Sequence, residues 1–173
     1  MKAVGGDIQT VFVLDDDEAV RDSLGALLES DGFEVATFGS GAEFLDRFDP
    51  VRGGCLVLDV RMPGLSGLEV QEKLAEKGIT LPVIIITGHG DVPIAVQALK
   101  AGAVDFIEKP FADDVILESV RLALEQGQQI KQDMSSATEI EARLARLTPR
   151  ERDVMEHLVI GNPKQGHCLR TWD

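Results

Sequence analysis

Cysteine, basic side chains and long apolar runs are all scarce in this chain of 173 residues, and each shortage excludes a class of protein. Two cysteines are too few for the disulfide framework of a small secreted domain, so we expect a reducing compartment. No run reaches the roughly 18 apolar residues that cross a bilayer. Residues 1–10 also lack the apolar centre of a signal peptide. We therefore expect a cytoplasmic protein with no membrane partner.

Acidic side chains outnumber basic ones by 30 to 17, which gives a net charge of −13. A protein that coats nucleic acid needs the opposite balance, because its lysines and arginines neutralise phosphates. The surplus is unevenly placed. Residues 141–173 carry six basic and five acidic side chains, so the whole excess of acid lies in the first 140 residues. The acidic character belongs to the first domain.

Short apolar runs alternate with amphipathic stretches up to about residue 126. The runs are almost continuously apolar, which is typical of parallel strands covered on both faces. Five such units with right-handed crossovers predict an α/β fold with a doubly wound, five-stranded parallel sheet. The expected strands are residues 10–15, 33–37, 55–59, 82–87 and 104–108. The expected helices are residues 18–30, 41–48, 66–77, 91–101 and 112–126.

Four of the apolar runs end at side chains that can do chemistry. The first is followed by Asp15 and Asp16, and the third ends on Asp59. The fourth ends on Thr87, and the fifth leads into Lys109. Ligands of parallel α/β sheets bind outside the carboxyl ends of the strands. We therefore expect these acids, the hydroxyl and the amine to converge at one edge.

Closely spaced carboxylates repel each other, and a bound cation relieves that repulsion. Mg²⁺ takes oxygen ligands and keeps several waters, so we predict a Mg²⁺ site. Asp16 and Asp59 are the expected direct ligands, and Asp15 binds directly or through a water. The backbone carbonyl of Arg61, in the loop after Asp59, is the expected further oxygen.

With the cation in place, one oxygen of Asp59 is free to act as a nucleophile, since aspartates form aspartyl phosphates. Mg²⁺ and Lys109 would stabilise charge on a transferring phosphoryl group. The hydroxyl of Thr87 would donate to a phosphate oxygen. Pro110 follows Lys109, and a cis peptide there costs only about 0.5–1 kcal/mol. A cis bond would direct the lysine inward, but the sequence leaves cis and trans open.

Four short motifs stand in order at the ends of the predicted strands. They are Leu14-Asp15-Asp16-Asp17, Asp59-Val60-Arg61-Met62-Pro63, Thr87-Gly88 and Lys109-Pro110. In this order and spacing they resemble the receiver domain of two-component response regulators, over residues 8–126. Residues 86–92 and 102–111 are similar to the FixJ-type subgroup of that family.

The resemblance implies a flavodoxin-like receiver over residues 1–126 that accepts a phosphoryl group on Asp59 from a sensor histidine kinase. It implies a phospho-acceptor that dephosphorylates itself, rather than an enzyme with turnover. It also implies a switch in which Thr87 moves toward the phosphate and Phe106 turns inward. Many receivers have Tyr at that place, so Phe excludes any inward state that needs a hydroxyl. Dimerisation and regulation of transcription are the usual consequences in this family.

The sequence changes character after residue 126. Residues 127–146 are polar and weakly periodic, which predicts a linker with helical character. Thr148 is a good N-cap, Pro149 suits the first helical position, and Glu151 completes a capping box. Residues 147–154 resemble the opening of a LuxR/FixJ-type DNA-binding domain, in which a helix-turn-helix follows.

We expect that second domain to be incomplete. Only 26 residues remain from Thr148, and residues 166–173 lack the apolar period and turn residues of a recognition helix. Residues 147–173 are then a fragment of an all-α domain, truncated or frame-shifted near residue 165. Specific DNA binding should be weak or absent, because without a recognition helix the chain has no complete site for reading base edges.

Two other functions remain open. Haloacid-dehalogenase-like phosphatases also use an aspartate at a strand end with Mg²⁺. Their pattern would begin at Asp15, but its fifth position is Ala19, and the chain has no room for a cap domain. The other alternative is a stand-alone receiver that acts through protein–protein contacts or as a phosphate sink. The identity of the phosphorylated residue tests the first alternative, and DNA binding tests the second.

Overall fold

The computed structural model describes residues 9–88 and 92–159, in which strands and helices alternate as predicted. The strands are β1 (Thr10–Leu14), β2 (Glu34–Phe38), β3 (Gly54–Asp59), β4 (Val83–Thr87) and β5 (Asp105–Glu108). The helices are α1 (Glu18–Ser30), α2 (Gly41–Arg47), α3 (Gly67–Glu76), α4 (Val92–Lys100), α5 (Asp113–Ala145) and α6 (Pro149–Val159). Within the described ranges, no helix is both long enough and apolar enough to cross a membrane.

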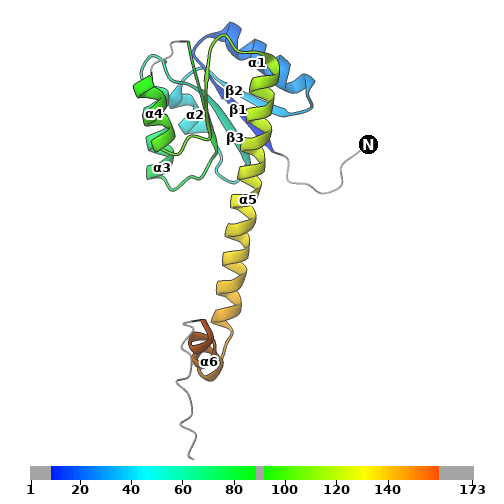
Figure 1. Cartoon of the computed structure of the whole chain (residues 1–173), viewed down its shortest axis with the longest axis vertical. Coiled ribbons are helices and arrows are strands. Elements are labelled where there is room, and N and C mark those ends of the chain that lie inside the picture. Colours follow the sequence, from blue (N-terminus) through cyan, green and yellow to red (C-terminus); the bar gives the residue numbers. More distant parts are fainter. Residues whose placement is uncertain (1–8, 89–91, 160–173) are drawn as a thin grey trace, which may run out of the picture. The chain divides into compact units, whose positions relative to one another are not determined.

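The five strands form one parallel sheet in the order β2-β1-β3-β4-β5, which confirms the predicted doubly wound fold. From β1 the chain first winds outward to β2 and then crosses to β3 on the other side. The strand order therefore reverses between β1 and β3. Open α/β sheets bind ligands at such a point, outside the carboxyl ends of the strands. In Figure 1 these two strands lie side by side at the centre of the sheet.

Two apolar layers cover the sheet, because successive strand residues point to opposite faces. Along β1, Val11 and Val13 belong to the layer formed with α1 and α5. Phe12 and Leu14 belong to the layer formed with α2, α3 and α4. Figure 1 shows this division of the helices between the two faces. Every residue of β1, β3 and β4 is buried, which explains why their sequences are continuously apolar.

Cys55 lies in β3, the strand that ends on Asp59, and its side chain is fully buried. Burial raises the pKa of the Cys55 thiol to about 12, because a thiolate is poorly solvated in an apolar layer. The thiol is therefore protonated at neutral pH, and Cys55 packs as a small apolar residue.

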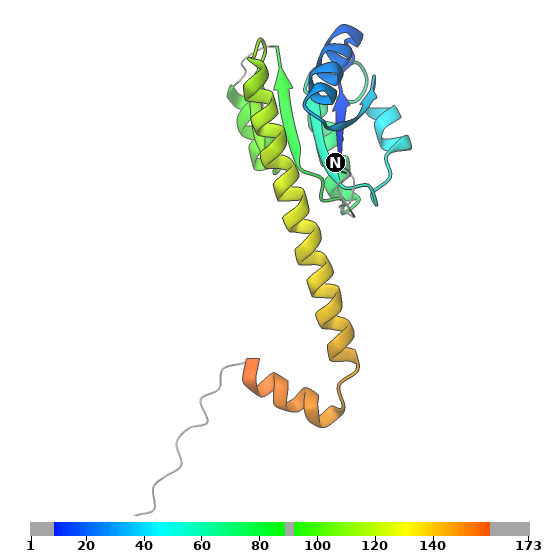
Figure 2. The same cartoon turned by 90° about the vertical axis from the view of Figure 1, so that its right-hand side faces the viewer.

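Helix α5 continues past the expected end of the last receiver helix. We expected a helix over residues 112–126 followed by a linker with helical character, and α5 runs unbroken from Asp113 to Ala145, so the linker is helical up to residue 145 (Figure 2). Residues 127–145 contain no proline and many good helix formers, so the helix persists without a clear apolar period. Gly127 lies inside this helix, close to the start of β3. A Cβ there would lie 3.1 Å from the carbonyl oxygen of Gly54.

The chain divides into two compact units, residues 1–131 and 132–173, with the boundary inside α5. In the second unit, the backbone N–H of Thr148 donates to Glu151 Oε2 at 2.8 Å, and the Glu151 N–H donates to Thr148 Oγ1 at 3.4 Å. This reciprocal pair confirms the predicted helix start. Residues 160–173, on which the expected incompleteness rests, lie outside the described residues. The domain assignments of residues 127–146 and 147–173 stay predictions.

Gly54 opens β3 beside β1, and this position has no room for a side chain. A Cβ would lie 1.8 Å from the carbonyl oxygen of Thr10, a backbone atom of the neighbouring strand. At the preceding Gly53 the nearest atom would be Lys131 Nζ at 3.9 Å, an ordinary contact. We expect Gly54→Ala to lower the free energy of unfolding by about 3 kcal/mol or more, and Gly53→Ala by less than about 1 kcal/mol. Urea unfolding measures both, and equal losses would contradict the steric argument.

Candidate functional site

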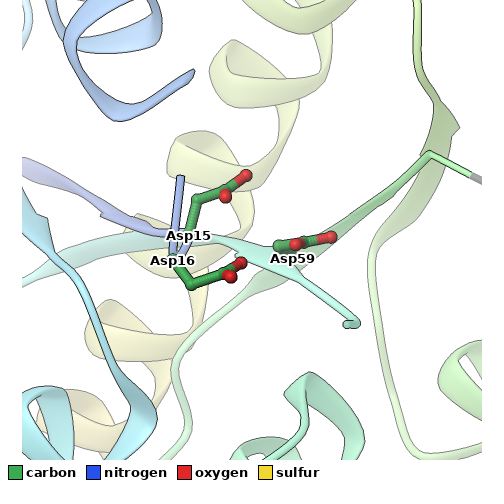
Figure 3. A group of neighbouring side chains, drawn as sticks. All are labelled: Asp15, Asp16 and Asp59. Atoms are coloured by element: carbon green, nitrogen blue, oxygen red, sulfur yellow. The ribbon is translucent and has the colours of Figure 1, made fainter. Parts of the chain in front are cut away.

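Three carboxylates meet where β1 and β3 end. Asp15 and Asp16 follow β1, and Asp59 is the last residue of β3. Leu14 pairs with Leu58 in the parallel register, so the acids leave neighbouring strands at the same level. Figure 3 shows the three side chains projecting into one space, where one oxygen of each lies within 4.8 Å of the others. This donor set of carboxylate oxygens fits a hard cation such as Mg²⁺.

Asp15 is held on both of its carboxylate oxygens. Its Oδ1 accepts a hydrogen bond from the backbone N–H of Asp17 at 2.9 Å, and its Oδ2 accepts one from Lys109 Nζ at 2.8 Å. Only 1% of Asp15 is exposed, and a buried carboxylate is tolerated when it is paired and hydrogen-bonded in this way. Asp15 therefore forms a fixed wall of the site, whereas Asp16 beside it is exposed to solvent.

Lys109 reaches the site from the end of β5. Its backbone N–H donates to the carbonyl oxygen of Thr87 at 2.7 Å, which extends the β4–β5 pairing by one residue. Its ammonium lies 2.8 Å from Asp15 Oδ2 and 3.9 Å from Asp59 Oδ1. The peptide bond to Pro110 is cis, which answers the question that the sequence left open. The structure thus brings one amine between two of the acids.

Asp59 is only 6% exposed, and its environment opposes ionisation. Burial is the largest cause and raises the pKa of Asp59 from 3.8 to about 6. The Lys109 ammonium lowers the pKa in part, and the charges of Asp15 and Asp16 raise it again. A hydrogen bond from the backbone N–H of Arg61 also favours the carboxylate. Without a cation, a substantial fraction of Asp59 is therefore protonated in mildly acidic solution.

The other predicted residues lie around this centre. Thr87 ends β4, next to β3, and is 1% exposed. Phe106, in β5, is half-buried and packs against the layer of α2, α3 and α4. Arg61 and Pro110 are both exposed. The roles predicted for the Arg61 carbonyl, for Thr87 and for Phe106 stay predictions, because their positions do not decide them.

Two residues that position the site were missed in the sequence. A Cβ at Gly67, the first residue of α3, would lie 2.4 Å from the carbonyl oxygen of Asp59, so only glycine lets α3 begin against the loop that follows it. Arg21 donates from Nη1 to the carbonyl oxygen of Asp15 at 2.8 Å. The capping box of Ser66 and Glu69 was a usable signal for the start of α3. No sequence pattern signals the contact of Arg21.

Residues 11–121 match the response regulator receiver domain. The chain belongs to this family. One relative is the transcriptional regulatory protein FixJ of Bradyrhizobium diazoefficiens, which is 48% identical over 87% of this chain and 74% of its own length. The response regulator protein TmoT of Ectopseudomonas mendocina is 44% identical, over 87% of this chain and 69% of its own length. The predicted resemblance to response regulators, and to the FixJ type among them, is confirmed.

Solved receiver structures share the fold. The response regulator StyR superimposes with a TM-score of 0.80 at 42% identity, over 88% of this chain and 77% of its own. The crystal structure of FixJ-N has a TM-score of 0.65 at 52% identity, over 68% of this chain and 94% of its own. The receiver's relatives are signalling proteins rather than classical enzymes, so they give no support to the phosphatase alternative.

The raised pKa of Asp59 makes the stability of the metal-free receiver depend on pH. Folding raises this pKa, so the stability it contributes is complete below about pH 4 and is lost as the pH rises through 6. Asp59→Asn removes this loss of stability, because an amide does not ionise. Its free energy of unfolding should exceed that of the wild type by on the order of 2 kcal/mol at pH 7, and the two should converge near pH 4.

Urea unfolding between pH 4 and pH 8 measures this difference. Asp46→Asn is the matched control, because Asp46 is an exposed aspartate on α2, outside the site. A control variant that gains as much stability as Asp59→Asn would show that the site is not the cause. Added Mg²⁺ should reduce the advantage of Asp59→Asn, since a cation that binds the wild-type site stabilises the wild type by mass action.

Proposed function

We propose that this receiver is the phosphorylation-controlled switch of a two-component system. A sensor histidine kinase transfers a phosphoryl group to Asp59, and the altered receiver then dimerises and regulates transcription. The observation that carries the proposal is the placement of Asp59, a buried carboxylate that belongs to a candidate cation site and lies 3.9 Å from the ammonium of Lys109. Such a site suits phosphoryl transfer, where positioning and charge neutralisation provide almost all of the catalysis.

In the transfer, an oxygen of Asp59 attacks phosphorus and a P–O bond forms. The P–N bond of the donor's phosphohistidine breaks, and its electron pair returns to the imidazole nitrogen. The phosphoryl oxygens bring negative charge into a site that already holds carboxylates. Lys109, 3.9 Å from Asp59 Oδ1, is placed to pair with one of these oxygens. Mg²⁺, when bound, supplies further positive charge.

The chain offers four groups to hold Mg²⁺. We assign Asp16 and Asp59 as direct ligands and the backbone carbonyl of Arg61 as a further one. Asp15 binds directly or through a water. The indirect arrangement is favoured, because both oxygens of Asp15 already accept hydrogen bonds, from Asp17 and Lys109.

A groove beside the site suits the approach of the kinase. It has a volume of about 570 Å³ and lies between the first three turns of α1 and the segment that leads into α5. Lys109 is part of its wall, so a partner seated there lies next to the acceptor. The lining residues are Ala19, Val20, Ser23, Leu24, Leu27, Lys109, Pro110, Phe111 and Asp113.

Thr87 and Phe106 are the proposed readers of the phosphate. They lie on the neighbouring strands β4 and β5, where Ile85 pairs with Phe106 two residues before Thr87. The hydroxyl of Thr87 turns toward the new phosphate, and the half-buried ring of Phe106 turns into the space that it leaves. Because Phe has no hydroxyl, packing alone decides between the two ring positions.

An exposed apolar stripe on α4 supports dimerisation as the consequence. Val92, Val96 and Leu99 recur at helical spacing and are 72%, 44% and 49% exposed. Burying such a stripe against a second copy is favourable, since apolar area leaves water. A shift of β5 on phosphorylation would move α4, and with it the stripe, because α4 packs against β5.

The proposed role in transcription rests on the relatives of this chain, one of which is called a transcriptional regulatory protein. The alternative is a stand-alone receiver that acts by protein–protein contact or as a phosphate sink. Mobility shifts with the phosphorylated chain separate the two. Nanomolar, sequence-specific binding to a promoter supports the transcription role, and its absence supports the alternative.

Phosphate uptake tests the central step. With acetyl phosphate and Mg²⁺, or with a phosphorylated histidine kinase, the wild-type chain should gain one phosphoryl group that is labile to base and to hydroxylamine. Asp59→Asn should gain none, because the nucleophilic oxygen is lost. Intact-protein mass spectrometry measures the uptake, and Asp46→Asn is the control with the same chemical change at an exposed site. Equal labelling of Asp59→Asn would place the acceptor elsewhere.

Dimer formation tests the output. A phosphoryl analogue with Mg²⁺ should raise the dimer fraction of the wild type in analytical ultracentrifugation. Val96→Asp should prevent this rise, because it places a charge in the apolar stripe of α4. Val51→Asp is the matched control, since Val51 is 81% exposed before β3 and outside the stripe. A control that fails to dimerise, or a wild type of unchanged mass, would contradict the proposed interface.

A further inference from the structure

We propose that Arg21 is a positioning residue for the cation site, although it touches none of the three carboxylates. Its guanidinium fixes the peptide between Asp15 and Asp16, and thereby the directions in which both side chains leave the backbone. The inference rests on the proposed Mg²⁺ site and adds a residue to its construction.

The first observation is the hydrogen bond from Arg21 Nη1 to the carbonyl oxygen of Asp15, at 2.8 Å. That carbonyl belongs to the planar peptide unit that joins Asp15 to Asp16. Holding its oxygen fixes the orientation of the whole plane, including the N–H of Asp16. The backbone N–H of Asp15 donates to the carbonyl oxygen of Phe38 at 3.3 Å, so Asp15 is held on both sides of its Cα.

The second observation is that the guanidinium of Arg21 lies next to the turn between β2 and α2. Its guanidinium lies over Gly39, where a Cβ would be 3.5 Å from Nη1 and 3.6 Å from Cζ. The N–H of Gly39 donates to Glu43 Oε2 at 3.1 Å, and the opposite oxygen of Glu43 pairs with Arg47 at 2.9 Å. The hydrogen bond from the Gly39 N–H is the largest cause that lowers the pKa of Glu43, followed by Arg47, and the charge of Arg21 adds a smaller lowering. Arg21 thus lies between the site loop and the turn that precedes α2.

The third observation is that Arg21 leaves the carboxylate oxygens of the site free for a cation. Lys109 binds a carboxylate oxygen of Asp15 directly, in competition with a cation. Arg21 binds a backbone carbonyl instead, so its contact removes no carboxylate oxygen from the site. The planar fork of a guanidinium suits this task better than an ammonium, because its donors are held in a fixed geometry.

A positioning role and a purely electrostatic role of Arg21 predict opposite changes in Mg²⁺ affinity when Arg21 is removed. As a positive charge alone, Arg21 repels Mg²⁺, so its removal should tighten cation binding. As a positioning residue it organises the ligands, so its removal should weaken binding by about tenfold, the lower end of the losses seen for outer-shell partners. Arg21→Lys keeps a donor for the Asp15 carbonyl but loses the fixed geometry of the guanidinium, so it should bind Mg²⁺ with an affinity between those of the wild type and Arg21→Met.

Isothermal titration of the full chain with Mg²⁺ tests the inference in the wild type, Arg21→Met, Arg21→Lys and Arg121→Met. Arg121→Met is the matched control, because it also removes one arginine, in this case from the pair that Arg121 of α5 forms with Asp31, the residue after α1. Thermal unfolding without Mg²⁺ is recorded alongside. A merely structural role lowers the melting temperature and leaves the dissociation constant of the folded protein unchanged.

We expect Arg21→Met to bind Mg²⁺ about tenfold more weakly than Arg121→Met, at a temperature where both are folded. A dissociation constant within twofold of the control, or a tighter one, overturns the inference while the Mg²⁺ site stands. If the wild type itself binds no Mg²⁺, the proposed cation site fails and the inference fails with it.

Discussion

Electrostatic repulsion at the ends of β1 and β3 is the constraint on which this site depends. The parallel register places Asp15 beside Asp59, and neither strand can move away, because each is buried on both faces. Burial of Asp59 adds to the effect of its neighbours' charges, and the ammonium of Lys109 does not cancel the two together, so the pKa of Asp59 is raised to about 6. Much of the affinity for a cation is therefore built into the fold, since binding relieves a repulsion that folding imposes.

The sheet could be predicted from sequence because its signal is local. Each strand of the centre is a short run of apolar residues between loops, and burial on both faces makes that run continuous. The end of helix α5 could not be predicted for a related reason, although residues 127–146 were expected to have helical character. The apolar period that identifies a packed helix fades after Leu124, yet the backbone needs only helix-forming residues and no proline to continue. Packing patterns therefore locate where a helix is buried, rather than where it ends.

The members of the site could be predicted because each stands at or just after the end of a strand. Parallel strands bring their carboxyl ends to one edge, so Asp15, Asp59 and Lys109 had to lie near each other. Their pairing could not be predicted. Lys109 lies closer to Asp15 than to Asp59, which depends on loop geometry that spacing does not encode. Contacts between a side chain and a distant backbone atom, such as that of Arg21 with Asp15, leave no sequence pattern.

Because Cys55 is fully buried in β3, its thiol can serve as a probe for the opening of that strand. The chain has no tyrosine and its single tryptophan is Trp172, so the described residues contain no strong near-ultraviolet chromophore. The reactivity of the Cys55 thiol can report on unfolding instead. With its pKa raised to about 12 and no exposed surface, its thiol reacts with an alkylating reagent only when β3 opens. The rate of Cys55 alkylation thus measures opening of the very strand that carries Asp59, and any ligand of the site that holds β3 closed must slow it.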